Sequence, residues 1–232
     1  MLTTQVHTNN RTDVVSGLAV DIDDTLAASV HRWMARLDEE FPAARYKNLE
    51  DRDLTIDQLV SKYTFAMHVP YWSGVPEIHS RLVEIRTNPE EILAVEPIEG
   101  AVKALSAIHQ RIPVLCYFST RPQSLYAATS EWLKQSGFPS AELILTPDSV
   151  PNSEADRWKV DLIAQRGDIG GIIDNSSDVV SLFPDNYQGV VFHFGVDRTP
   201  LTKSYEIIPC PSWERVERAV SEREARIRNL TP

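Results

Sequence analysis

Acidic residues follow an apolar run near the start of the chain. The run from Val14 to Val20 leads into Asp21, with Asp23 and Asp24 close behind. Side chains at positions i and i+2 of a strand point to the same face, so Asp21 and Asp23 are expected to lie together where the strand ends. Two unit charges about 4 Å apart repel by roughly 4 kcal/mol at an effective dielectric of 20. A hard divalent cation would offset this repulsion, so the pattern indicates a metal-assisted phosphate site.

Hydroxyl and basic side chains follow a second apolar run. Residues 113–118 are followed by Ser119, Thr120 and Arg121. Charge-assisted hydrogen bonds from such donors suit a phosphoryl group. Arg121 has two equally favoured interpretations: a further positive contact for the phosphoryl group, or a structural group that caps the end of the strand.

Further charged residues are associated with a later apolar run. Residues 171–173 are followed by Asp174 and Asn175, with Asp178 four positions after Asp174. Lys159 is the only lysine between positions 135 and 202. A phosphate close to three carboxylates can bind only if cations cancel the repulsion, which is the role expected for Mg²⁺ and Lys159.

The elements that must position these residues alternate along the chain. Strands are predicted over residues 14–20, 113–118, 142–145, 171–173 and 190–194, with another near 205–208. Helices are predicted over 100–110, 123–136, 153–165 and 175–183. This alternation predicts an α/β fold, a Rossmann-like three-layer sandwich with a parallel sheet. Active sites in such sheets lie beyond the carboxyl ends of the strands, where Asp21 is placed.

Helix boundaries are indicated by local signals. Gly137 is suited to follow the end of the helix over 123–136. Ser153 and Asp156 form a capping-box-like start for the helix over 153–165.

The segment between Thr25 and Pro97 lacks a convincing strand. Apolar residues recur at helical spacing from Val30 to Phe41, Thr55-x-x-Gln58 is typical of a capping box, and Pro76 favours a helix start. We therefore predict an inserted α-helical cap over the site, with a plain extension of the core as the alternative.

The aromatic-rich stretch of the predicted cap has two interpretations. Tyr63, His68, Tyr71 and Trp72 either stack on a substrate ring or pack as a connection between helices, and packing is favoured.

The predicted organisation is a discontinuous core, 14–30 and 95–209, interrupted by the cap at 31–94. Residues 210–232 are expected to form a C-terminal helix that packs on the core, and 1–13 a flexible arm.

Composition restricts the class of protein. A formal net charge of -10 over 232 residues argues against a nucleic-acid-binding surface. The N-terminus lacks the apolar region of a signal peptide, and no apolar run is long enough to span a membrane, so a cytoplasmic location is expected. Cys116 and Cys210 are interpreted as reduced, buried thiols. Oligomeric state is not readable from the sequence.

The order of these pieces resembles the haloacid dehalogenase-like (HAD) phosphohydrolase superfamily. Its four motifs are DxDx[TV], a strand-end Ser or Thr, a Lys and a strand-end acidic pair. They are matched by Asp21-x-Asp23-x-Thr25, Ser119, Lys159 and Asp174 with Asp178. The resemblance covers about residues 14–209.

The resemblance implies a role for each matched residue. Asp21 would be the nucleophile that forms an aspartyl-phosphate, and Asp23 the general acid and then the base. Ser119 would bind a phosphoryl oxygen, with Thr120 as the alternative and Arg121 as a further contact. Lys159 would steady Asp21 and the transferring group.

The resemblance also implies a Mg²⁺ site. Asp21, the backbone carbonyl of Asp23 and Asp174 would hold the ion, and Asp178 would complete the set directly or through water. Asn175 stands where many members have a second acid, and Asp24 replaces a common glycine.

The sequence thus predicts a Mg²⁺-dependent phosphatase that acts on a small phosphorylated metabolite, of the nucleotide or sugar phosphate class. A phosphomutase and a non-catalytic phosphate-binding scaffold are the alternatives. A response-regulator receiver is disfavoured because its lysine follows the phosphoacceptor and hydroxyl, whereas Lys159 precedes Asp174. No GxxxxGK[ST] or GxGxxG motif occurs.

Overall fold

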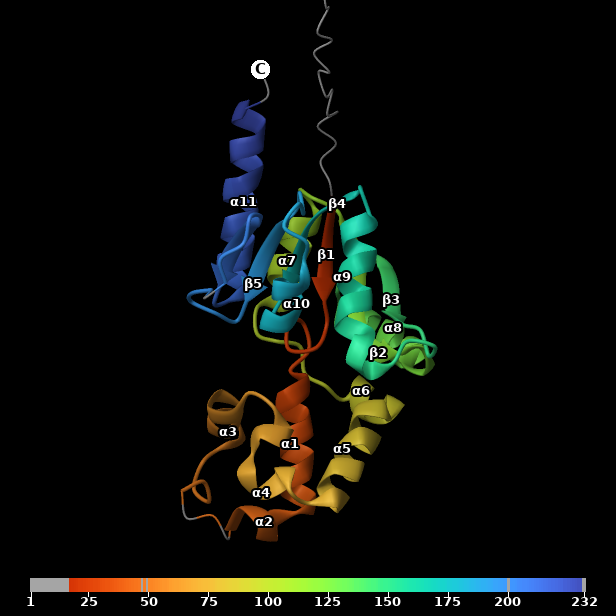
Figure 1. The fold of residues 1–232 in the computed structure, drawn as a ribbon, viewed down its shortest axis with the longest axis vertical. Helices are drawn as coiled ribbons and strands as arrows, with labels where there is room; N and C mark the ends of the chain where they lie inside the picture. The colour runs from red at the N-terminus through yellow and green to blue at the C-terminus, as the bar shows by residue number, and fades with distance from the viewer. Residues whose placement is uncertain (1–16, 47, 49, 200, 231–232) are drawn as a thin grey trace, which may run out of the picture.

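The computed structural model describes residues 17–230 except 47, 49 and 200. Within them, six parallel strands form one sheet in the order β3-β2-β1-β4-β5-β6 (Figure 1). The strands are β1 Gly17–Asp21, β2 Val114–Pro122, β3 Glu142–Thr146, β4 Ile169–Asp174, β5 Val190–Phe194 and β6 Glu206–Cys210. The predicted Rossmann-like parallel sheet is confirmed. The predicted arm 1–13 and the strand residues 14–16 lie outside the described part.

Helices cover both faces of the sheet. One face packs on α7 (Ala101–His109), α8 (Tyr126–Gln135) and α11 (Trp213–Leu230), and the other on α9 (Ala155–Gln165) and α10 (Ser177–Leu182). Because side chains alternate along a strand, Leu18 and Val20 join the first hydrophobic cluster and Ala19 joins the second. This double burial explains why the strands read as continuous apolar runs. Cys116 and Cys210 are free and buried, as predicted.

A separate set of helices follows β1. They are α1 Ser29–Glu40, α2 Pro42–Tyr46, α3 Ile56–Tyr63, the 3-10 turn η1 Ala66–His68, α4 Pro70–Ser73, α5 Pro76–Thr87 and α6 Pro89–Leu93. We call residues 29–94 the helical segment. Helices α1 to α5 surround a hydrophobic cluster of their own, from Val30 to Ile85, and lie beyond one end of the sheet (Figure 1). Trp72 is fully buried in that cluster, and Tyr71 packs against it.

The end of the helical segment belongs to the packing of the sheet. Ile92 of α6 and Val95 lie in the hydrophobic cluster on the α8 face. The indole N–H of Trp132 donates to the backbone oxygen of Val95 at 2.8 Å. Helix α6 therefore joins the helical segment to the core.

Most predicted helix starts and ends match the structure. Thr55 and Gln58 form a capping box at α3, and Pro76 is the first residue of α5. Gly137 follows the last turn of α8 with a φ of 83°, a left-handed conformation that suits glycine.

The predicted capping box at Ser153 is wrong. Residues Asn152–Glu154 form a 3-10 turn, η3, that runs directly into α9. Glu154 takes the N-cap position without a side-chain hydrogen bond. The chain after Pro151 is already helical at this point, so Ser153 does not have the extended backbone that a capping residue needs. Among the described residues, no helix combines the length and apolar character needed to cross a bilayer.

Candidate active site

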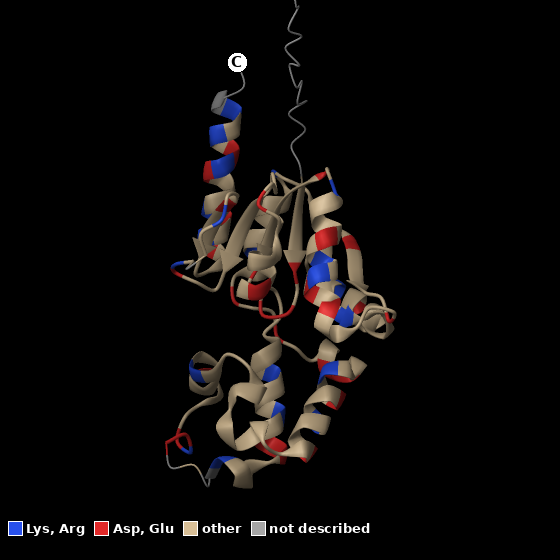
Figure 2. Ribbon diagram, in the orientation of Figure 1, with Lys and Arg blue, Asp and Glu red and all other residues tan. Residues whose placement is uncertain are grey.

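The turn after β1 brings several carboxylates to the end of the sheet that faces the helical segment. The backbone oxygen of Ile22 accepts hydrogen bonds from the N–H groups of Leu26 and Ala27 at 2.8 and 2.9 Å, which closes the turn. Figure 2 shows acidic residues on the loops between the sheet and the helical segment.

Asp24 adopts a left-handed backbone conformation in this turn, with a φ of 57°. Asp is among the non-glycine residues that tolerate this region best. Its carboxylate accepts a hydrogen bond from the backbone N–H of Val30 at 3.0 Å, in the first turn of α1. Asp24 therefore takes the position of the common glycine and also links the turn to the helical segment. Burial raises its pKa to about 7, although that hydrogen bond opposes the shift.

Lys159 joins the ends of β1 and β4. Its Nζ donates to Asp21 Oδ1 at 2.5 Å and to Asp174 Oδ2 at 2.6 Å. All three residues are buried, with exposed fractions of 6% or less. The other oxygen of Asp174, Oδ1, accepts a hydrogen bond from the backbone N–H of Ser176 at 2.8 Å. Two strand ends and one helix thus place an ammonium group between two carboxylates.

The charge in this cluster is unbalanced. Burial raises the pKa of Asp21 to about 7; Lys159 opposes that rise, and the charge of Asp174 adds to it. Burial acts to lower the pKa of Lys159, but the two carboxylates outweigh it and hold the pKa above its usual range. Two buried carboxylates therefore share one cation, and the missing positive charge is reflected in the raised pKa of Asp21.

Asp23 is held by donors from two places in the chain, the end of β2 and the start of α1. Arg121 donates through Nη2 to Oδ1 at 2.7 Å and through Nε to Oδ2 at 3.0 Å. Ser119 Oγ donates to Oδ2 at 3.0 Å, and Ser29 Oγ donates to Oδ1 at 2.5 Å. Burial acts to raise the pKa of Asp23, but Arg121 and the hydroxyl groups outweigh it and lower the pKa. Asp23 is therefore ionised in this arrangement.

The turn after β1 and the loop after β4 are tied together by hydrogen bonds. Thr25 Oγ1 donates to Asn175 Oδ1 at 3.1 Å and accepts from the Asn175 backbone N–H at 3.2 Å. The indole N–H of Trp213 donates to the backbone oxygen of Thr25 at 2.9 Å. Thr25 and Asn175 therefore hold the two acidic loops at a fixed separation.

The structure brings most, but not all, of the sequence-predicted residues together. Asp21, Lys159 and Asp174 form one cluster, and Asp23, Ser119 and Arg121 form an adjoining one. Thr120 is half-buried, and its hydroxyl makes no hydrogen bond within the described part of the chain. Asp178 is exposed on α10, and its carboxylate likewise has no partner among the described residues.

Sequence reasoning missed other residues at the site. Ser29 contacts Asp23, and the only available signal was its place at the start of the helical pattern from Val30. Asp156, one turn before Lys159 on α9, is half-buried; burial raises its pKa, Lys159 opposes that, and Asp174 and Asp178 reinforce it. The sequence pattern indicates only a helix-capping role for Asp156.

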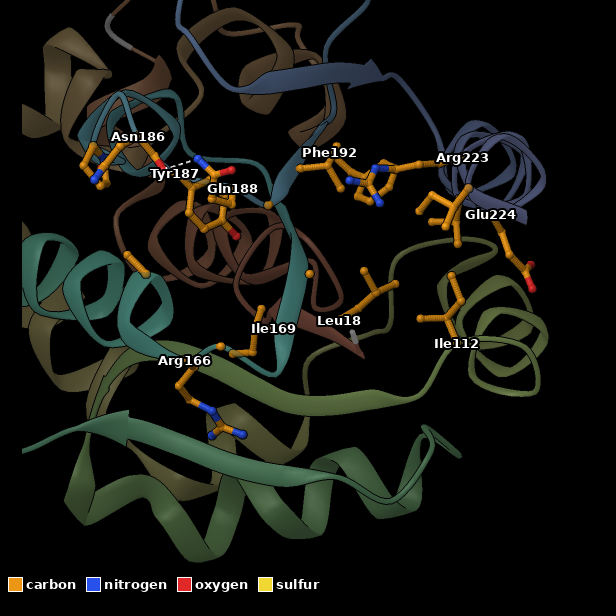
Figure 3. A pocket seen from close by; sticks show the side chains of 18 of the residues that line it. Leu18, Ile112, Arg166, Ile169, Asn186, Tyr187, Gln188, Phe192, Arg223 and Glu224 are labelled. Carbon is orange, nitrogen blue, oxygen red and sulfur yellow. Dashed lines mark hydrogen bonds between the residues drawn. The ribbon is translucent and has the colours of Figure 1, made fainter. Parts of the chain in front are cut away.

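A cavity of about 660 Å³ lies at the opposite end of the sheet (Figure 3). Leu18, Ile169 and Phe192 line it from the strands, Ile112 lies just before β2, and Arg223 of α11 also lines it. None of the clustered acidic residues borders this cavity, so it is separate from the candidate site.

Solved structures of two hydrolases and of a haloacid dehalogenase-like protein resemble this chain over most of its length. A HAD family hydrolase from Deinococcus radiodurans, with bound phosphate and sodium, gives a TM-score of 0.51 at 13% identity, covering 89% of this chain and 95% of that chain. A hydrolase from Pseudomonas syringae gives 0.50 at 15% identity, covering 89% and 98%. A haloacid dehalogenase-like protein of unknown function from Agrobacterium tumefaciens gives 0.50 at 13% identity, covering 89% and 98%.

These comparisons define the fold. No family model matches the sequence, and no curated protein gives a significant match. The chain has the HAD-like fold that the motifs led us to expect. At identities of 13–15% the likeness shows the fold alone.

Proposed function

We propose that this protein is a Mg²⁺-dependent phosphatase that hydrolyses a small phosphomonoester through an aspartyl-phosphate on Asp21. The observation that carries the proposal is the buried pair Asp21 and Asp174 bridged by Lys159. A buried acid with a raised pKa at the carboxyl end of a parallel strand, as Asp21 is, is a candidate for catalysis. The similar D. radiodurans hydrolase contains bound phosphate, which is in keeping with this class of ligand.

The donor set suits Mg²⁺. Within the described residues, no three His, Cys, Asp or Glu side chains are arranged to hold a metal. Mg²⁺ does not require such a cage, because it usually binds one or two carboxylates and completes its shell with water and substrate phosphate. Asp21 and Asp174 would supply those carboxylates, and their shared deficit of positive charge favours a cation. When bound, Mg²⁺ would neutralise charge on the phosphoryl oxygens.

In the proposed first step, Asp21 attacks phosphorus. Lys159 holds Oδ1, which leaves Oδ2 of Asp21 to form the new O–P bond. The bond between phosphorus and the leaving oxygen breaks, and the leaving oxygen takes a proton from Asp23. Lys159 keeps Asp21 oriented and offsets negative charge that gathers on the phosphoryl group.

Asp23 must first gain that proton, and the geometry suggests how. Arg121 and Ser119, the donors expected to bind phosphate, both donate to Asp23 in this structure. A phosphate dianion would compete for these donors. Loss of their hydrogen bonds would raise the pKa of Asp23, so that it takes up a proton as substrate binds.

In the second step Asp23 acts as the base. It accepts a proton from a water molecule whose oxygen attacks phosphorus. The O–P bond to Asp21 breaks, phosphate leaves and Asp21 is regenerated. We propose that the helical segment acts as a cap that excludes other water during the reaction, because it lies directly beyond the acidic end of the sheet.

A phosphate-release assay tests the proposal. The purified protein is given p-nitrophenyl phosphate, nucleotides and sugar phosphates with Mg²⁺, and the Asp21→Asn variant is assayed in parallel. We expect phosphate release by the wild type only, and mass spectrometry of acid-quenched protein should locate the phosphoryl group on the peptide that contains Asp21. Equal activity of the two proteins would support the scaffold alternative, and an isomer in place of free phosphate would support a mutase.

A further inference from the structure

A guanidinium group of the helical segment lies against two aromatic rings. Arg86 is in the last turn of α5, and its Cζ lies 4.9 Å from the centre of the Trp33 ring and 5.8 Å from that of Phe65. Trp33 is buried, Phe65 is half-buried and Arg86 is exposed. Cation–π contacts of this kind hold a guanidinium group without using its N–H donors.

Arg86 differs from the other arginines of the helical segment because it has no carboxylate partner within the described part of the chain. Among the described residues, each of the other five forms an ion pair: Arg32 with Glu91, Arg36 with Glu39, Glu40 and Glu91, Arg45 with Asp38, Arg52 with Asp53, and Arg81 with Glu40 and Glu84. No ion pair or side-chain hydrogen bond of Arg86 occurs in that part of the chain. Its five N–H donors therefore remain available to a ligand.

The position of Arg86 is close to the acidic site. Trp33, on which it rests, is one helical turn beyond Ser29 and Val30, on the same face of α1. Those two residues donate to Asp23 and Asp24 respectively. Helix α5 packs beside α1, and its C-terminal end meets α6, which packs on α8 (Figure 1). The positive charge of Arg86 also acts to lower the pKa of Asp24.

We propose that Arg86 binds a second anionic group, a carboxylate or phosphate, on the leaving-group side of the phosphomonoester. This inference rests on the proposed function and narrows its substrate class to phosphomonoesters that carry a second anionic group. The planar fork of arginine matches both groups through paired hydrogen bonds.

The charges of the site favour such a residue. Among the described residues, Lys159 pairs with the carboxylates of Asp21 and Asp174, Arg121 pairs with that of Asp23, and Asp24 has only the backbone N–H of Val30 as a donor. These two cations are committed to the reacting end of the site. A second anion on the substrate would be repelled unless another cation received it, and Arg86 is the unpaired arginine that the helical segment places nearby.

Matched ligands test this inference through binding alone. The Asp21→Asn protein is titrated calorimetrically with 3-phosphoglycerate and with glycerol 3-phosphate, which replaces the carboxylate with a hydroxymethyl group. Fructose 1,6-bisphosphate and fructose 1-phosphate form the corresponding pair for a second phosphate. We expect at least one anionic ligand to bind about 10-fold or more tightly than its neutral partner, since hydrogen bonds to charged groups are strong.

Addition of Arg86→Gln should reduce that preference to about 2-fold or less, and Arg86→Lys should retain part of it. The matched control is Arg81→Gln on the same helix, because Arg81 already pairs with Glu40 and Glu84; it should keep the full preference. A preference that is absent, or that Arg86→Gln leaves intact, would overturn the inference. Because binding is measured without turnover, this result is independent of whether the wild type releases phosphate.

Discussion

Two buried carboxylates, one in each region of the molecule, are treated in opposite ways. Asp51 in the helical segment accepts hydrogen bonds from Lys62 Nζ at 2.7 Å and Tyr63 Oη at 2.6 Å, with Asn48 Nδ2 at 3.3 Å. Burial acts to raise its pKa, but these donors outweigh burial and lower it. Asp21 at the sheet edge shares a single ammonium with Asp174, and its pKa rises to about 7.

The difference shows that the donors around an acid, together with the depth of its burial, separate a structural acid from a chemical one. Asp51 has enough donors to remain ionised, so its interactions support the fold. Asp21 lacks them, so its ionised form is costly until another cation arrives. A site that binds a cation and a phosphate needs an acid with too few donors of its own. A connection between helices has no such need.

The sharpest test of this contrast exchanges each acid for its amide. Asp21→Asn should lower phosphate release by about 10³-fold or more, because the amide is not a nucleophile toward phosphorus. Asp51→Asn should instead lower the free energy of unfolding by about 2 kcal/mol through the loss of charged hydrogen bonds. Steady-state kinetics and thermal unfolding of both variants provide the measurements.

The two variants act as controls for each other. Asp21→Asn should keep or raise Tm in the absence of Mg²⁺, and folded Asp51→Asn should keep wild-type kcat. A large loss of Tm in Asp21→Asn, or of kcat in folded Asp51→Asn, would contradict the assignment of one acid to chemistry and the other to structure.

Removal of one donor from each acid is a milder form of the same test. Ser119→Ala should lower kcat/KM by about 10- to 100-fold, because its hydroxyl contacts Asp23 and is expected to bind phosphate. Tyr63→Phe should leave kcat/KM unchanged and cost about 1 kcal/mol of stability. Thr120→Ala, whose hydroxyl makes no hydrogen bond in the described structure, is the control. A larger kinetic effect in Thr120→Ala than in Ser119→Ala would transfer the phosphate contact to Thr120.

The sequence was sufficient to predict the architecture because its local signals agree. Runs such as Val190–Phe194 coincide with a strand, since strands buried on both faces must be apolar throughout. The start of α9 was mispredicted because a capping box and a 3-10 turn after Pro151 use similar polar residues. The length of β2 was underestimated because its last residues, Ser119 to Pro122, include the polar residues of the site.

The candidate site was only partly predictable. Asp21, Ser119 and Lys159 stand out because polar residues at strand ends or isolated on a helix have few structural explanations. Arg86 did not, because an arginine on an amphipathic helix usually belongs to a solvated face, and only the tertiary packing of α1 on α5 shows that it lacks a partner. The contact of Arg86 with Trp33 joins residues far apart in the sequence, and local periodicity does not predict such contacts.

Mg²⁺ should raise the Tm of the protein, and this rise should depend on the acids at the sheet edge but not on Asp51 of the helical segment. At a concentration about 100 times its Kd, a ligand stabilises the native state by about 2.7 kcal/mol. For a chain of this size that corresponds to a rise of about 5–10 °C in Tm. Asp174→Asn should remove most of the rise, and Asp51→Asn should retain it. The same rise in wild type and Asp174→Asn, measured by differential scanning calorimetry, would exclude Asp174 as a ligand.

The last effect is a pH dependence of opposite sign for the two acids. Between the unfolded pKa near 3.8 and the folded value of about 7, native Asp21 holds a proton that the unfolded chain has released. Its contribution to stability is therefore present at low pH and lost as pH rises through about 7. The folded pKa of Asp51 is lowered, so its contribution is present above about pH 4 and lost as pH falls further.

Without Mg²⁺, wild-type Tm should therefore fall by about 5–10 °C relative to Asp21→Asn between pH 5 and pH 8, since each pH unit below the folded pKa corresponds to about 1.4 kcal/mol and about 1 kcal/mol shifts Tm by about 2–4 °C in a chain of this size. The difference between wild type and Asp51→Asn should stay constant over the same range, because Asp51 is ionised in both the native and unfolded chains there. If the Tm of the wild type runs parallel to that of Asp21→Asn from pH 5 to pH 8, Lys159 already balances the negative charge of Asp21 and Asp174. The contrast with the helical segment would then disappear.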